Sequence, residues 1–152
     1  MPKSFRASWY AAILLLLSLG LFLETAAAVE PGPPDADAPT QFSTTPSGLK
    51  YKVLRKGTDE KPKAGNTVTV HYRGWLDDGK EFDSSYKRGK PLSFPLNRVI
   101  PGWTEGMQLV GKGGMIELEI PSELGYGAQG AGGGAIPPNA RLHFLVELID
   151  VK

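Results

Sequence analysis

Cysteine is absent from this sequence of 152 residues. Its absence excludes disulfides, a lipid-modified cysteine, a cysteine nucleophile and zinc ligands provided by cysteine. The sequence has two histidines, His71 and His143, which we expect on strand faces opposite the core, so we predict no metal site. The folded part, of roughly 100 residues, must therefore be stabilised by packing alone.

A surplus of charge of one sign is absent as well, because 17 basic residues are balanced by 16 acidic ones. Without a basic run, nucleic acid is not an expected partner. The glycine-rich runs at 111–114 and 127–134 lack the spacing and the Lys-Ser/Thr ending of a phosphate-binding loop. We interpret the second run as a flexible flap over a cleft.

Long apolar runs are lacking except for one near the start, at residues 9–23. This run follows Lys3 and Arg6 and precedes Ala26-Ala27-Ala28, an order typical of a secretory signal with its cleavage site. We predict a signal peptide over residues 1–28, with an uncleaved membrane anchor as the alternative. Either interpretation takes the folded part out of the cytosol, to the periplasm or the medium, or leaves it tethered to a membrane.

The next stretch, residues 29–46, is rich in proline and small polar residues. Such a composition buries little apolar surface and breaks helices and strands, so it predicts a flexible linker. The remaining residues, 47–152, are predicted to form the one folded domain.

Alternating apolar and polar residues predict several strands in that domain. The clearest is 67–75, in which Val68, Val70 and Tyr72 share one face. A helix is predicted at 101–109, because Pro101 suits a first helical turn. Strands and one short helix together predict an α+β fold, with an antiparallel sheet curled around the helix. The predicted strands are 50–56, 67–75, 80–83, 92–96, 115–120 and 142–150.

A candidate site centres on Asp83, which follows Phe82 and a strand that carries Tyr72. Apolar and aromatic residues of the segments 99–103, 124–127 and 136–140 complete an apolar pocket for a small ligand or a peptide. Two simpler interpretations of these residues stay open when only their local sequence is considered. The aromatic residues, Trp103 included, are also ordinary core residues, and Asp83 also suits a turn.

Five motifs in this order make the chain resemble the FKBP family of peptidyl-prolyl cis-trans isomerases, from residue 48 to residue 152. They are Val-His-Tyr-x-Gly-Trp-Leu, Gly-Lys-x-Phe-Asp-Ser-Ser, Val-Ile-Pro-Gly-Trp-x-Glu-Gly, Tyr-Gly-Ala and Ile-Pro-Pro-Asn-Ala. The resemblance implies a half-barrel sheet around one helix. It also implies binding of proline-containing polypeptides and of macrolides such as rapamycin.

The resemblance also implies roles for particular residues. Trp103 is expected as the pocket floor, Asp83 as the pocket acid held by Tyr72 and Arg88, and Tyr126 as a hydroxyl donor. The backbone N–H of Ile136 is expected to bind a ligand carbonyl. The expected walls are Tyr72, Phe82, Val99, Ile100 and Phe144. Leu92 departs from the family, because eukaryotic relatives usually have phenylalanine at this position of the rim.

Rotation about an X–Pro bond needs neither a nucleophile nor a cofactor, since the barrier of about 18–20 kcal/mol comes from amide resonance. We therefore expect a non-covalent isomerase without cofactor that assists the folding of exported proteins. The alternative is a non-catalytic chaperone or scaffold domain that binds peptides. Some exported relatives carry a helical dimerisation arm, for which residues 29–46 are too short and too proline-rich, so we expect a monomer.

Overall fold

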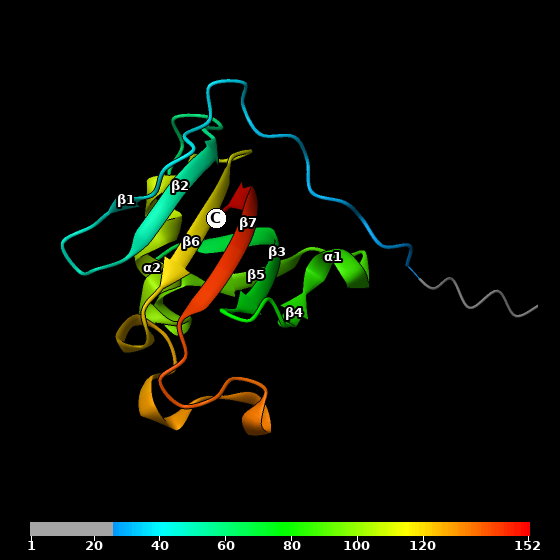
Figure 1. Cartoon of the computed structure of the whole chain (residues 1–152). Coiled ribbons are helices and arrows are strands. Elements are labelled where there is room, and N and C mark those ends of the chain that lie inside the picture. Colours follow the sequence, from blue (N-terminus) through cyan, green and yellow to red (C-terminus); the bar gives the residue numbers. More distant parts are fainter. Residues whose placement is uncertain (1–25) are drawn as a thin grey trace, which may run out of the picture.

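Seven antiparallel strands form one curled sheet in the computed structural model, which describes residues 26–152. The order of the strands is β1-β2-β6-β7-β3-β4, and β5 pairs with β3 beside β4. Figure 1 shows the sheet wrapped around α2. The strands are β1 (Ser43–Thr44), β2 (Lys50–Arg55), β3 (Thr67–Leu76), β4 (Glu81–Ser84), β5 (Leu92–Pro95), β6 (Met115–Ile120) and β7 (Leu142–Val151); the helices are α1 (Ser85–Arg88) and α2 (Pro101–Gly106). The α+β fold predicted from the sequence is confirmed.

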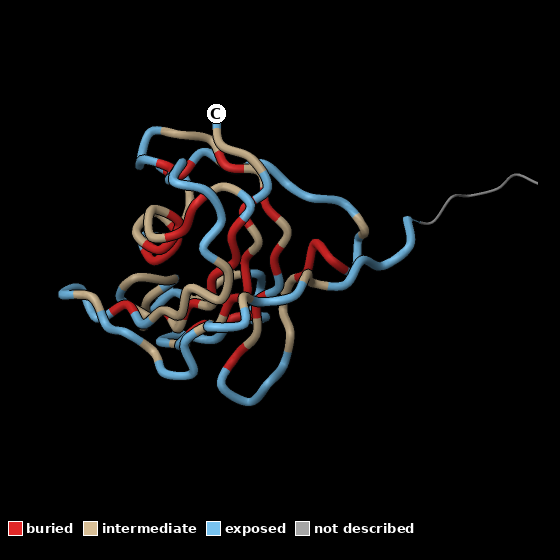
Figure 2. Tube along the Cα trace, turned by 90° about the horizontal axis from the view of Figure 1, so that it is seen from above, coloured by how far each residue is buried: buried red, intermediate tan, exposed pale blue. Residues whose placement is uncertain are grey.

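The core lies between the concave face of the sheet and α2. Trp103 of α2 and Met107, just after it, are buried against β6 and β7. Gly106 lets the helix approach the sheet closely, because a Cβ added there would lie 2.7 Å from a methyl carbon of Leu118. Figure 2 shows the buried residues concentrated along the central strands and α2. This packing leaves one end of the concave face open to receive a ligand.

Three details of the secondary structure differ from the predictions, the first being β1, which lies inside the predicted linker and pairs with β2. The α-helix ends at Gly106, and a 3₁₀ turn, Met107–Leu109, completes the predicted helical span. The sequence analysis also missed α1, a single turn whose N-cap Ser84 accepts a hydrogen bond from the backbone N–H of Lys87. A helix of four residues is too short to produce a recognisable apolar periodicity, and its capping is the only local signal.

Part of the proline-rich segment is attached to the outer face of the domain. The backbone N–H of Val29 donates to the carbonyl oxygen of Tyr86 in α1 (3.0 Å), and that of Gly32 donates to Glu147 of β7 (3.1 Å). Asp35 accepts a bond from the N–H of Lys56 (2.9 Å). These contacts differ from the free linker that the composition predicts, because they use backbone groups, which composition does not report.

The predicted signal, residues 1–28, lies almost entirely outside the described residues. Within residues 26–152, no helix has both the length and the apolar character needed to cross a membrane. The boundaries at residues 28 and 46 stay predictions.

Candidate functional site

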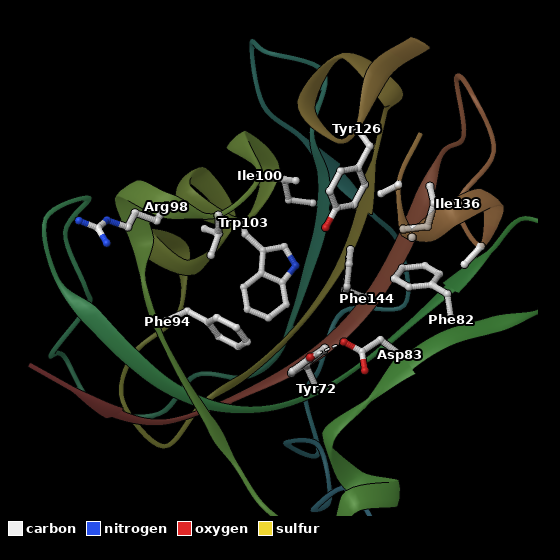
Figure 3. A pocket seen from close by; sticks show the side chains of 14 residues that line it. Tyr72, Phe82, Asp83, Phe94, Arg98, Ile100, Trp103, Tyr126, Ile136 and Phe144 are labelled. Carbon is white, nitrogen blue, oxygen red and sulfur yellow. Dashed lines mark hydrogen bonds between the residues drawn. The ribbon is translucent and has the colours of Figure 1, made fainter. Parts of the chain in front are cut away.

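A cavity of about 580 Å³ opens between α2, the inner face of β3, β4, β5 and β7, and the loop before β7. Its volume lies within the range typical of sites for small molecules. Figure 3 shows that the lining side chains converge from these separate elements. The lining residues are Tyr72, Phe82, Asp83, Phe94, Arg98, Val99, Ile100, Trp103, Tyr126, Ala131, Gly132, Ala135, Ile136 and Phe144.

The floor of the cavity is the indole ring of Trp103, presented by the first turn of α2. Three aromatic rings meet it edge to face, with centroid distances of 5.3 Å to Tyr72, 5.7 Å to Phe94 and 5.3 Å to Phe144. Its Nε1 is buried and has no hydrogen-bond partner among residues 26–152. Four rings held against each other make a rigid apolar floor with one unused donor.

The polar corner of the cavity is an ion pair tied to a tyrosine. Arg88 Nη1 lies 2.5 Å from Asp83 Oδ1, and Arg88 Nη2 donates to the Tyr72 hydroxyl over 3.1 Å. The Tyr72 hydroxyl donates in turn to Asp83 Oδ2. Asp83 comes from β4, Arg88 from α1 and Tyr72 from β3, so the short helix α1 brings the arginine back to the carboxylate.

This network controls the protonation of its members. Burial would raise the pKa of Asp83, but the hydrogen bonds from Arg88 and Tyr72 outweigh it and hold the pKa below its usual range. Burial and the bond to Asp83 raise the pKa of Tyr72 to about 12. Asp83 is therefore a charged acceptor with its charge compensated, and Tyr72 is a neutral donor, at any physiological pH.

The loop between β6 and β7 supplies the opposite wall. Tyr126 is partly exposed, and its hydroxyl has no partner within the described part of the chain. Burial, followed by the charge of Asp83, raises the pKa of Tyr126. Ile136 and Ala131 pair as an isolated bridge, in which the N–H of Ile136 donates to the Ala131 carbonyl over 3.1 Å.

That bridge corrects the predicted use of Ile136. Its N–H already has an acceptor, so Ile136 contributes its apolar side chain to the wall and not a free donor. The backbone N–H of Ile100, the N-cap residue of α2, has no acceptor among residues 26–152. Sequence reasoning missed this donor, although a helix start followed by Pro101 signals unpaired N–H groups.

The remaining predicted residues are placed as follows. Nine of them line the cavity, namely Tyr72, Phe82, Asp83, Val99, Ile100, Trp103, Tyr126, Ile136 and Phe144. Arg88 contacts the lining through its bonds to Asp83 and Tyr72. Leu92, which was predicted at the rim, is 36% exposed on β5 and is not part of the lining.

Several lining residues were not predicted. Phe94 lies on the same strand face as Leu92, and an aromatic residue at that spacing was a usable signal. Arg98, Ala131, Gly132 and Ala135 belong to 3₁₀ turns and loops, for which the sequence pattern offers no comparable signal. No group of three potential metal ligands occurs within residues 26–152.

Comparison with known proteins identifies a family and several relatives. A family model described as "FKBP-type peptidyl-prolyl cis-trans isomerase" matches residues 58–149. The "FKBP-type peptidyl-prolyl cis-trans isomerase FkpA" of Escherichia coli (strain K12) is 58% identical over 109 residues, which are 72% of this chain and 40% of that protein. "Outer membrane protein MIP" of Legionella longbeachae is 50% identical over 107 residues, 70% of this chain and 46% of that protein. The chain thus spans less than half the length of these curated relatives.

Solved structures share the fold. The crystal structure of FkpA from Escherichia coli matches with a TM-score of 0.71 and 54% identity, covering 75% of this chain and 53% of that one. The crystal structure of AtFKBP13 matches with a TM-score of 0.66 and 40% identity, covering 74% of this chain and 99% of that one.

Proposed function

Because the chain belongs to the FKBP-type peptidyl-prolyl cis-trans isomerase family, we propose that it accelerates rotation about X–Pro bonds in other polypeptides. The observation that carries this proposal is the cavity over Trp103, whose interior is apolar and aromatic around one compensated ion pair, with the charge of Arg98 at its edge. The substrate proline ring is expected to lie on the indole, among Tyr72, Phe82 and Phe144.

The chemistry required is selective binding of the twisted amide. Twisting removes amide resonance, so the carbonyl becomes less polar and the nitrogen more basic than in the planar forms. Transfer from water into an apolar cavity therefore costs less desolvation free energy for the twisted form than for the planar forms. This difference lowers the barrier to rotation. An acceleration of about 10⁴-fold corresponds to about 5.5 kcal/mol. Desolvation and one or two hydrogen bonds are sufficient to supply it.

Two donors are accessible to hold the substrate backbone while the amide turns. The Ile100 N–H and the Tyr126 hydroxyl lie at the cavity and lack partners among the described residues, and the Trp103 Nε1–H lacks one too but is buried. Asp83 has no role as a base in this proposal, because Arg88 and Tyr72 already occupy its two oxygens. Its role is to fix the Tyr72 ring and the polarity of that corner.

We extend the proposal to location and partners. Residues 1–28 have the pattern of an export signal, and one relative is named an outer membrane protein, which supports action on exported polypeptides. We propose a monomer that acts without a cofactor and binds macrolides such as rapamycin in the same cavity. The second candidate function is a peptide-binding chaperone without catalysis. The leucine at position 92 favours it, since eukaryotic relatives usually have a phenylalanine there and Leu92 makes no contribution to the cavity lining.

The proposal is tested by the cis-to-trans isomerisation of a short Ala-Pro-Phe peptide, with and without rapamycin. Acceleration that rapamycin blocks is the expected result. Trp103→Leu is expected to lower kcat/KM by at least about tenfold. Trp75→Leu, on the outer face of β3, is expected to leave kcat/KM close to the value of the unchanged protein. Binding of the peptide without acceleration by a folded protein would favour the chaperone function instead.

A further inference from the structure

Within residues 26–152, Arg98 is the one cation that lines the cavity, and it has no counter-ion there. It closes the 3₁₀ turn Leu96–Arg98, which leads directly into the cavity wall at Val99 and Ile100. Its side chain is exposed, and no residue of the described chain forms an ion pair or a hydrogen bond with it. Figure 3 shows its guanidinium at the edge of the pocket, pointing away from the interior, beyond Phe94 and Trp103.

The other charges near the opening do not neutralise it. Asp83 is paired with Arg88 at 2.5 Å, so these two charges largely cancel. Glu105 of α2 lines a separate hollow, where its carboxylate accepts a hydrogen bond from Ser47 over 2.6 Å, and it forms no ion pair with Arg98. In the part of the chain that the structure describes, the cavity lining therefore carries a positive charge outside any ion pair on the Arg98 side, which attracts an acidic group on an incoming peptide.

The position of Arg98 determines which part of a peptide it meets. A peptide carbonyl that accepts a bond from the Ile100 N–H places the adjacent peptide residues alongside residues 98–100. Two residues of extended chain span about 7 Å, which is also about the reach of an arginine side chain. The guanidinium thus reaches a side chain one or two residues away from the proline, and not the proline itself.

We propose that Arg98 is a specificity-determining residue that favours substrates with an acidic side chain one or two residues from the proline. This inference rests on the proposed isomerase function. A guanidinium suits the task because its two N–H groups bind both oxygens of a carboxylate in parallel. Because the site is open to water, the gain is modest and depends on salt.

The test compares peptides that differ by one charge. Acetylated and amidated Pro peptides carry Glu or Gln at each of the two positions before and after proline, so that no blocking group adds a charge. The ratio of kcat/KM for Glu over Gln is measured at low and at high salt. We expect a ratio of about two to five at one of these positions at low salt, falling toward one at high salt.

Variants assign the effect to Arg98. In Arg98→Gln the ratio is expected to fall to about one, and in Arg98→Lys it is expected to be partly kept. Lys90→Gln removes an exposed charge from a residue that does not line the cavity, and the ratio is expected to stay as in the unchanged protein. A ratio of one at every position, or a ratio that survives in Arg98→Gln, overturns this inference alone. Absence of turnover with every peptide, Gln series included, overturns the proposed function and this inference with it.

Discussion

At the scale of single residues, the backbone of the sheet at Gly74 of β3 lies close to two rings of the pocket. It pairs with Asp83 on one side and with Phe144 on the other. A Cβ at this position would lie 2.6 Å from carbon atoms of both Phe82 and Phe144. The edge-to-face pair of these rings, with centroids 5.5 Å apart, therefore requires glycine beneath it.

Replacing this glycine provides a first prediction. Gly74→Ala is expected to lower the free energy of unfolding by about 1–3 kcal/mol, because the added methyl group overpacks the site. It is also expected to lower kcat as well as raise KM, because the displaced rings form part of the cavity wall. Denaturant unfolding and peptide isomerisation measure the two effects.

Gly65→Ala is the matched control, since a Cβ there meets no atom within 4 Å. It is expected to leave both quantities nearly unchanged. Equal effects of the two substitutions would show that loss of glycine, and not the contact with the rings, is responsible.

At the scale of elements, α1 is held from two sides although it has only four residues. Ser85 Oγ is fully buried, accepts a hydrogen bond from the Tyr72 N–H (2.7 Å) and donates to the Tyr72 carbonyl (3.2 Å). On the outer side, the Tyr86 hydroxyl donates to Glu147 (2.6 Å), which also pairs with Arg55 at 2.5 Å. Such a short helix is not stable alone, so these contacts maintain it and the Arg88 that it carries.

Glu147 provides the prediction for this scale, because it joins α1 to the segment before β1. Burial would raise the pKa of Glu147, but the bonds from Tyr86 and Arg55 outweigh it and lower the pKa. Glu147→Gln weakens these bonds and is expected to lower the free energy of unfolding by about 1–3 kcal/mol. It is also expected to release the segment around Val29, which thermolysin would then cleave faster.

Glu117→Gln on β6 is the control for this prediction. Glu117 pairs with Lys52 at 2.7 Å and forms no bond to the segment before β1 in the described chain, so we expect a loss of less than about 1 kcal/mol in the free energy of unfolding and no change in cleavage. If thermolysin cleaves the two variants equally fast, Glu147 does not hold the segment.

At the scale of the whole molecule, the buried tyrosines make the free energy of unfolding fall as the pH rises in the alkaline range. The pKa of Tyr72 is raised to about 12 by burial and by Asp83, and that of Tyr86 is raised by burial and by Glu147. In the unfolded chain, a tyrosine ionises near pH 10. Above that pH the unfolded state loses protons that the folded state keeps, and this difference favours unfolding.

We therefore predict that Tyr72 contributes about 2–3 kcal/mol to the free energy of unfolding. This contribution is fully present below pH 10 and is lost between about pH 10 and 12. Denaturant unfolding at a series of pH values measures it. Tyr72→Phe is expected to be less stable at neutral pH but to lose less stability on going from pH 9 to 11. An equally steep loss in this variant would assign the alkaline effect to other groups, such as the lysines paired with Asp37 and Asp150.

The fold class and most of the pocket lining are predictable from the local pattern of residues. Alternation along 67–75 and 115–120 reports which side of each strand is apolar, and that is a local property of the chain. The motifs around Asp83 and Trp103 indicated the family before any geometry was known. For the same reason, Phe94 was within reach of the strand pattern, although it was not predicted.

Which backbone donors are free and which charges are paired within residues 26–152 depends on how the elements meet in three dimensions. The bridge between Ala131 and Ile136 occupies the N–H that was predicted to bind a ligand, and the N–H of Ile100 remains available instead. Likewise, the free charge of Arg98 and the attachment of the segment at Val29 depend on residues distant in sequence. Hydrogen bonds and ion pairs are contacts between elements, so their partners are set by how loops and strands meet in space, which no local periodicity encodes.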